Sequence, residues 1–82
     1  MVQHAVALFE NNLNDQSRAL LEVILDLHPD LPEAQFQLGL TCNALGDLGC
    51  TTAALTRFLE LAPDDPSAAT AEALLEYTTS QQ

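Results

Sequence analysis

Lysine and tryptophan are absent from this chain of 82 residues, and its only strongly basic side chains are Arg18 and Arg57. Twelve acidic residues against these two arginines give a formal net charge of -10. Such a surface repels phosphate backbones and anionic lipid headgroups, so neither nucleic acid nor a membrane is an expected partner. The acidity most simply keeps a small domain soluble, and selection for a basic partner is the alternative.

Long apolar runs are also missing, and no stretch approaches the roughly 18 residues of a membrane helix. The first ten residues, MVQHAVALFE, lack the basic segment and cleavage site of an export signal. Two cysteines, Cys42 and Cys50, are too few for a disulfide-stapled secreted scaffold. We therefore expect a cytoplasmic protein.

Catalytic and metal-binding motifs are lacking as well. His4 and His28 have no nucleophile or carboxylate at a motif-like spacing, and no P-loop, GxGxxG or HExxH occurs. His28 lies beside a proline at a predicted helix end, where it is expected to satisfy terminal carbonyls. The adjacent pair Asp64 and Asp65 is expected to cap a helix and not to bind a metal. We expect no enzyme activity and no cofactor.

What the chain does have is leucine and alanine, which favour helices, with one Tyr and three Phe. A chain this short can bury only about 60 to 65% of its unfolded surface, so it forms one small domain with one core. The composition therefore predicts a single all-helical domain.

An internal repeat organises the sequence. The proline clusters HPDLP and APDDP lie 34 residues apart, and residues 19–34 match residues 53–68 at half of their positions. The identical pairs are Ala19/Ala53, Leu21/Leu55, Leu25/Leu59, Leu27/Leu61, Pro29/Pro63, Asp30/Asp64, Pro32/Pro66 and Ala34/Ala68.

Hydrophobic periodicity and turn residues predict five helices. Asn14 or Asp15 is expected to cap the second of them. Apolar and polar residues alternate from Phe36 to Ala44, which nominally indicates a strand, but Gly39 is a poor strand former and the repeat matches this segment to a helix. The expected helices span residues 2–11, 16–27, the segment from Pro32 to the turn at Gly46, 50–61, and 68 to about 78.

The repeat resembles the tetratricopeptide repeat, whose signature is W-x₂-L-G-x₂-Y, then A-x₃-F, then P, within 34 residues. Gln35 stands in place of the tryptophan and Thr51 in place of the usual alanine. The second copy fills the other positions with Leu38-Gly39, Cys42, Gly46-Asp47, Leu55 and Pro63. The more divergent first copy has Met1 at the tryptophan position, followed by His4-Ala5, Leu8, Ser17, Leu21 and Pro29.

The resemblance implies an antiparallel helix-turn-helix solenoid with repeats at 1–31 and 32–65, a capping helix at 66–78 and a frayed tail at 79–82. It places Gly39 and Ala5 where the two helices of a repeat cross closely. Leu21 and Ile24, and likewise Leu55 and Phe58, should then fill the space between successive hairpins.

In this family the first helix of each hairpin lines a concave face that commonly holds an extended peptide. The resemblance therefore implies a non-catalytic scaffold that binds a protein or peptide. Val6 and Leu40 could equally pack against a missing repeat or a second copy of the chain, which would make it a homo-oligomer or a piece of a longer array. The predicted groove comprises Val2, Val6, Phe9, Glu10, Phe36, Gln37, Leu40, Asn43, Thr70, Leu74 and Tyr77.

Family members that clamp a terminal carboxylate do so with Lys, Arg and Asn on these inner helices. Here lysine is absent, and Arg18 and Arg57 fall on second helices, facing away from the groove. A basic or apolar partner segment is therefore the better expectation.

Cys42 and Cys50 flank the turn at Gly46 at equal distances in sequence. We expect two free buried thiols, because cysteine behaves as a small hydrophobe and Cys42 occupies a core position. A disulfide that acts as a redox-controlled lock on the hairpin is the alternative.

Overall fold

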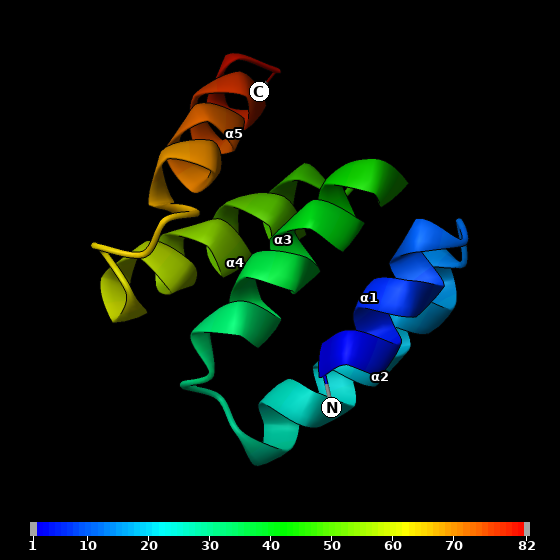
Figure 1. Cartoon of the computed structure of the whole chain (residues 1–82). Coiled ribbons are helices and arrows are strands. Elements are labelled where there is room, and N and C mark those ends of the chain that lie inside the picture. The colour runs from blue at the N-terminus through cyan, green and yellow to red at the C-terminus, as the bar shows by residue number, and fades with distance from the viewer. Residues whose placement is uncertain (1, 82) are drawn as a thin grey trace.

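The computed structural model describes residues 2–81, which form five α-helices and no strand. This confirms the prediction of an all-helical fold. Figure 1 shows how the helices are arranged. Met1, at the tryptophan position of the first repeat, and Gln82, at the end of the predicted frayed tail, lie outside the described residues. The helices are α1 Val2–Glu10, α2 Asn14–Leu27, α3 Pro32–Leu45, α4 Leu48–Leu61 and α5 Ala68–Gln81.

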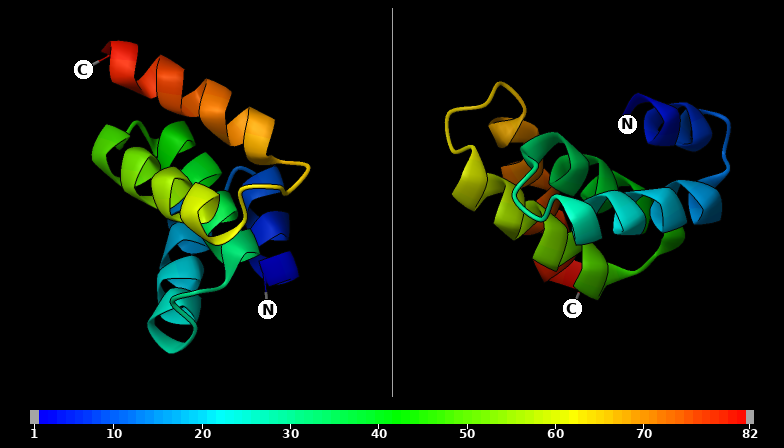
Figure 2. Two further views of the ribbon diagram at one scale, coloured as in Figure 1. Left: turned by 90° about the vertical axis from the view of Figure 1, so that its left-hand side faces the viewer. Right: turned by 90° about the horizontal axis from the view of Figure 1, so that it is seen from below.

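The helices pack as two hairpins and a fifth helix. Helix α1 lies against α2, α3 against α4, and the hairpins meet mainly through α2 and α3. Helix α5 packs against α4, so the α3–α4 hairpin lies between the first hairpin and α5 (Figures 1 and 2). Among residues 2–81, no helix is long and apolar enough to cross a membrane.

Turn residues set most of the helix boundaries. Helix α2 ends two residues before Pro29, and Pro32 occupies the first turn of α3. Gly46 ends α3 in the left-handed region at φ 78°, which costs little without a Cβ. The Asp47 side chain then accepts a hydrogen bond of 3.0 Å from the Cys50 backbone N–H, so α4 begins at Leu48, two residues earlier than predicted.

The predicted cap of α2 is wrong. Leu13, and neither Asn14 nor Asp15, is the residue that precedes the helix, and no side chain caps it. Asn12 reverses the chain at φ 63°, and the Leu13 backbone N–H donates back to the Leu8 carbonyl at 2.8 Å. This tight turn brings Asn14 into the helix itself.

Helix α5 continues to Gln81, beyond the predicted end near Thr78. The Thr78 hydroxyl donates to the Leu74 carbonyl at 2.8 Å, and the Ser80 hydroxyl donates to the Tyr77 carbonyl at 2.8 Å. The described part of the polar tail, through Gln81, is therefore part of α5.

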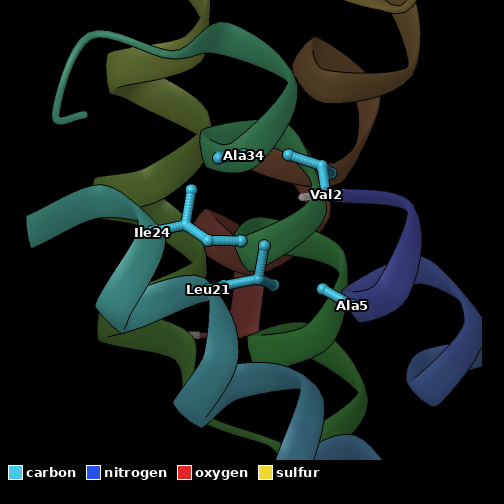
Figure 3. Close-up of a cluster of buried hydrophobic side chains, with 5 residues drawn as sticks. All are labelled: Val2, Ala5, Leu21, Ile24 and Ala34. Atoms are coloured by element: carbon cyan, nitrogen blue, oxygen red, sulfur yellow. The ribbon is translucent and has the colours of Figure 1, made fainter. Parts of the chain in front are cut away.

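Two apolar clusters form the core. The first joins α1, α2 and α3 through Val2, Ala5, Leu21, Ile24 and Ala34, as Figure 3 shows. The second joins α4 and α5 through Leu55, Phe58 and Ala71. The predicted burial of four repeat positions is confirmed: these are Leu21, Ile24, Leu55 and Phe58.

The close helix crossing within the second hairpin is confirmed at Gly39. A Cβ placed on Gly39 would lie 2.5 Å from Leu55 Cδ2, which is shorter than real contacts of this kind. Ala5, the equivalent residue of the first hairpin, is fully buried. Small side chains at these positions let the paired helices approach each other.

Buried hydroxyls occupy the equivalent positions Ser17 and Thr51. Ser17 Oγ donates to the Ala5 carbonyl at 2.8 Å and lies 3.3 Å from Thr41 Oγ1, linking α1, α2 and α3. Thr51 Oγ1 donates to the Asp47 carbonyl at 2.9 Å. All three hydroxyls therefore have hydrogen-bond partners, as buried polar groups require.

Candidate partner-binding hollow

A hollow of about 180 Å³ lies between α1, α3, the end of α4 and the loop that leads into α5. We call it the hollow throughout. It brings together four residues of the predicted groove with four that were not predicted. Its lining is Val2, Val6, Glu33, Phe36, Gln37, Phe58, Asp65 and Ser67.

Phe36 forms part of the wall and is tied to the core. Its ring centroid lies 5.0 Å from that of Phe58, with the planes tilted by 49°. This is a favourable aromatic geometry. Phe36 is half-buried and packs against the cluster of Leu55, Phe58 and Ala71, so it cannot be treated as a surface residue.

Gln37 is the least expected feature of the hollow. Its side chain is only 7% exposed, and its Nε2 donor has no hydrogen-bond partner among the described residues. A buried amide N–H without an acceptor costs free energy, which a ligand acceptor would recover. The sequence placed Gln37 in the groove but could not show that its donor is buried and unpaired.

Two carboxylates line the hollow. Glu33 lies in the first turn of α3, and Asp65 lies in the loop before α5. Asp65 Oδ1 accepts a hydrogen bond of 2.8 Å from the backbone N–H of Ser67, the residue before α5, and this bond orients the loop. The predicted capping is not found, since within residues 2–81 neither Asp64 nor Asp65 accepts a side-chain hydrogen bond from α5 itself. Both residues are exposed, so they can pair with a cation that approaches from solvent.

Sequence reasoning missed the contribution of Glu33, Phe58, Asp65 and Ser67. Glu33 and Ser67 occupy equivalent positions 34 residues apart, so the repeat carried a signal for these two. The signal for Phe58 and Asp65 is absent from the sequence, because their place depends on how α4 and the α4–α5 loop lie relative to α1 and α3.

The other predicted groove residues lie outside the hollow. Leu74 packs against the second core cluster, and Tyr77 is 56% exposed on α5. Helix α5 packs chiefly against α4, so it does not extend the wall formed by α1 and α3. The residues outside the hollow are Phe9, Glu10, Leu40, Asn43, Thr70, Leu74 and Tyr77.

Both arginines join one hairpin to the next on surfaces other than the hollow. Arg18 on α2 pairs with Asp47 in the α3–α4 turn at 3.0 Å, and with Glu22 at 3.7 Å. Arg57 on α4 pairs with Asp30 in the α2–α3 loop and with Glu60. Neither guanidinium lines the hollow, so its two carboxylates face no arginine there.

These ion pairs shift two pKa values. The backbone hydrogen bond from Cys50 and then the Arg18 pair hold the pKa of Asp47 below its ordinary range. Hydrogen bonds to Asp30 and then Glu60 raise the pKa of Arg57. Both groups lie at the surface, so solvent screens these contacts and each contributes little to stability.

Cys42 and Cys50 form a disulfide, which corrects the expectation of two free thiols. Their Cα atoms lie 5.8 Å apart, within the range that a disulfide spans. The left-handed turn at Gly46 and the Asp47 cap bring the last turn of α3 beside the first turn of α4. This turn geometry brings the two sulfur atoms within bonding reach.

Histidines and carboxylates do not form a metal site within residues 2–81, where no group of three His, Cys, Asp or Glu side chains is suitably placed. The terminal carbonyl of Ile24 is satisfied by the backbone N–H of His28, at 2.7 Å. The prediction that the His28 side chain binds carbonyls at the helix end is therefore wrong, because the backbone of His28 makes this bond instead.

No protein-family model, curated protein or solved structure matches the chain. The resemblance to the tetratricopeptide repeat therefore rests on the residue pattern alone and stays a prediction. Function has to be argued from the hollow and its chemistry.

Proposed function

We propose that this chain is a non-catalytic, tetratricopeptide-like module that binds a partner peptide or helix in the hollow. One observation carries the proposal: the nearly buried Gln37 amide offers an unpaired donor within an apolar lining rimmed by carboxylates. An unpaired buried donor in a hollow is a group that a ligand can satisfy.

Affinity would come from the apolar walls. Val2, Val6, Phe36 and Phe58 offer aliphatic and aromatic surface, and removing apolar surface from water favours association. Aromatic anchors at the centre of an interface commonly dominate binding. Glu33 and Asp65 would then select among partners by charge.

The proposed partner is a basic or apolar segment of a protein. A net charge of -10 raises the encounter rate with cationic segments and disfavours nucleic acid and anionic membranes. A cytoplasmic setting is part of the proposal.

Matched aromatic variants test the proposed function. Peptides that bind the protein are selected from a displayed random library, and their affinities are measured for Phe36→Leu and Tyr77→Leu. Each variant removes one ring, but only Phe36 lines the hollow. We expect Phe36→Leu to weaken binding about tenfold, which corresponds to about 1.4 kcal/mol, and Tyr77→Leu to leave it unchanged.

Circular dichroism must first show that both variants are folded. Unchanged affinity for a folded Phe36→Leu variant would show that the hollow is not the binding surface. An equal loss in Tyr77→Leu would place the contact on α5 instead.

The alternative function is stacking on a further repeat or a second copy. One observation favours it: α5 carries a second, shallow depression on its outer side, lined by Ala69, Glu72, Ala73, Leu75 and Glu76. The small side chains of Ala69 and Ala73 would let another helix approach α5 closely. Analytical ultracentrifugation tests stacking on a second copy, because a chain that remains monomeric at all micromolar concentrations does not self-associate.

A further inference from the structure

We propose that the occupant of the hollow is a lysine or arginine residue of an extended partner segment. This inference rests on the proposed function and names its partner chemistry. The backbone carbonyl of the basic residue accepts a hydrogen bond from Gln37 Nε2, its aliphatic stem lies on the apolar wall, and its charged end pairs with Glu33 and Asp65.

The unpaired donor defines the first contact. Gln37 Nε2 is buried, has no acceptor among residues 2–81, and belongs to a side chain that lines the hollow. A partner backbone carbonyl supplies an acceptor whatever the partner's sequence. The hydrogen bond removes the cost of the orphaned N–H, so it contributes more than an exposed hydrogen bond would.

Charge defines the second contact. Glu33 and Asp65 line the hollow, whereas both arginines are engaged in ion pairs elsewhere. The hollow therefore presents two carboxylates with no cation of its own among its lining residues. A cationic side chain complements this arrangement, and a carboxylate or phosphate would be repelled.

Helix ends do not reverse this preference. Helices α1, α3 and α5 all begin near the hollow, at Val2, Pro32 and Ala68. Each helix N-terminus carries about half of a positive elementary charge, which falls off within the first turn. The two full carboxylate charges, within a chain of net charge -10, keep the hollow attractive to cations.

Size and lining define the third contact. A volume of about 180 Å³ is several times the roughly 30 Å³ share of one water molecule, so a long side chain fits. The methylene stem of lysine or arginine packs on apolar surface while its charged end stays near water. The half-buried Phe36 ring, which also lines the hollow, offers that surface.

Two small probes isolate the charge. The ¹⁵N-labelled protein is titrated with N-acetyl-lysine N-methylamide or with N-acetyl-norleucine N-methylamide, which has a similar stem without the ammonium group. The readout is the NMR shift of the Gln37 side-chain amide. We expect the shift to saturate at millimolar concentrations of the lysine probe, with an affinity about fivefold higher than that of the norleucine probe. The difference is small because exposed ion pairs contribute little.

Charge-matched variants provide the control. Glu33→Gln combined with Asp65→Asn should reduce the lysine probe to the affinity of norleucine. Asp15→Asn combined with Asp26→Asn removes the same charge from exposed positions outside the hollow and should leave the preference unchanged. Gln37→Leu should weaken both probes by a similar factor.

The outcomes separate this inference from the proposed function. Equal affinity for the two probes, or no shift at the Gln37 amide, would overturn the basic-residue inference. If the peptides selected above still depend on Phe36, the proposed function stands without it. A lysine preference that survives in the Glu33/Asp65 variant would also overturn the inference, because its source would be the net charge.

Discussion

At the scale of single residues, the structure separates side chains that serve the core from those that serve the hollow. Gly39 and Leu55 have a packing role, because they let α3 and α4 approach each other. Gln37 does not serve the core in this way, since its buried amide donor has no hydrogen-bond partner within the described part of the chain. A residue that costs stability at a hollow is a candidate for function.

Replacing Gln37 by leucine should stabilise the protein by about 1 kcal/mol, because the buried unpaired donor is removed and the volume is nearly kept. Urea unfolding followed by circular dichroism measures the change. The exposed variant Gln3→Leu serves as the control and should change stability by less than about 0.5 kcal/mol. A loss of stability in Gln37→Leu would mean that the amide is satisfied in solution.

Gly39→Ala should lower the free energy of unfolding by about 1 to 2 kcal/mol. The new Cβ would collide with the fully buried Leu55 side chain, and this strain outweighs the gain in helix propensity of about 1 kcal/mol.

Gly49→Ala is the matched control on α4. Its nearest heavy atom would be Asp47 Oδ1 at 3.7 Å, an ordinary contact, so this variant should be neutral or stabilising by up to about 1 kcal/mol. The same urea unfolding serves both variants, and stabilisation by Gly39→Ala would contradict the close crossing.

At the scale of elements, the 34-residue repeat and the turn residues predicted five helices and most of their boundaries. The differences arise from local hydrogen bonds that periodicity does not report. The Asp47 cap starts α4 early, the reversal at Asn12 moves the start of α2, and α5 continues to Gln81. The presence of each helix was predicted from the sequence, whereas the exact residues at its ends depend on individual contacts.

The disulfide should stabilise the α3–α4 hairpin. Reduction should lower the free energy of unfolding by roughly 2 kcal/mol, because the unfolded chain regains the entropy of a short loop. Urea unfolding with and without dithiothreitol measures the effect. The double variant Cys42→Ala with Cys50→Ser should be insensitive to the reductant, and an equally insensitive parent protein would show that the bridge does not form in solution.

Asp47 should contribute a pH-dependent part of the stability. Its folded pKa lies below the ordinary value, so its contribution is present above that value and is lost as the pH falls below about 4. Asp47→Asn keeps a capping oxygen but removes the charge that pairs with Arg18. The stability difference between parent and variant should therefore shrink on acidification, and a constant difference from pH 6 to pH 3 would contradict the shift.

At the scale of the whole molecule, net charge competes with the contacts between hairpins. A formal charge of -10 on a chain this small produces self-repulsion, whereas the two arginines supply the ion pairs that link the hairpins. These pairs are exposed, so they contribute little. The apolar clusters and the disulfide must hold the fold against the repulsion.

Added salt should therefore stabilise the protein. Screening weakens the repulsion among the twelve acidic residues more than it weakens a few exposed ion pairs. The midpoint of thermal unfolding should rise by a few degrees as sodium chloride increases from about 0.01 to 0.2 M. A falling midpoint would show that the links made by Arg18 and Arg57 dominate.

The sequence alone determined the helical class, the two related hairpins and the small residues at their crossings, because periodicity, prolines and glycines act locally and leave a regular signature. It also indicated four of the hollow's residues through their repeat positions. Only the tertiary structure decided that Phe58 and Asp65 join them, that the Gln37 donor is left unpaired, and that Cys42 meets Cys50. These features depend on how the turn at Gly46 and the α4–α5 loop orient whole helices, and a local pattern does not encode that orientation.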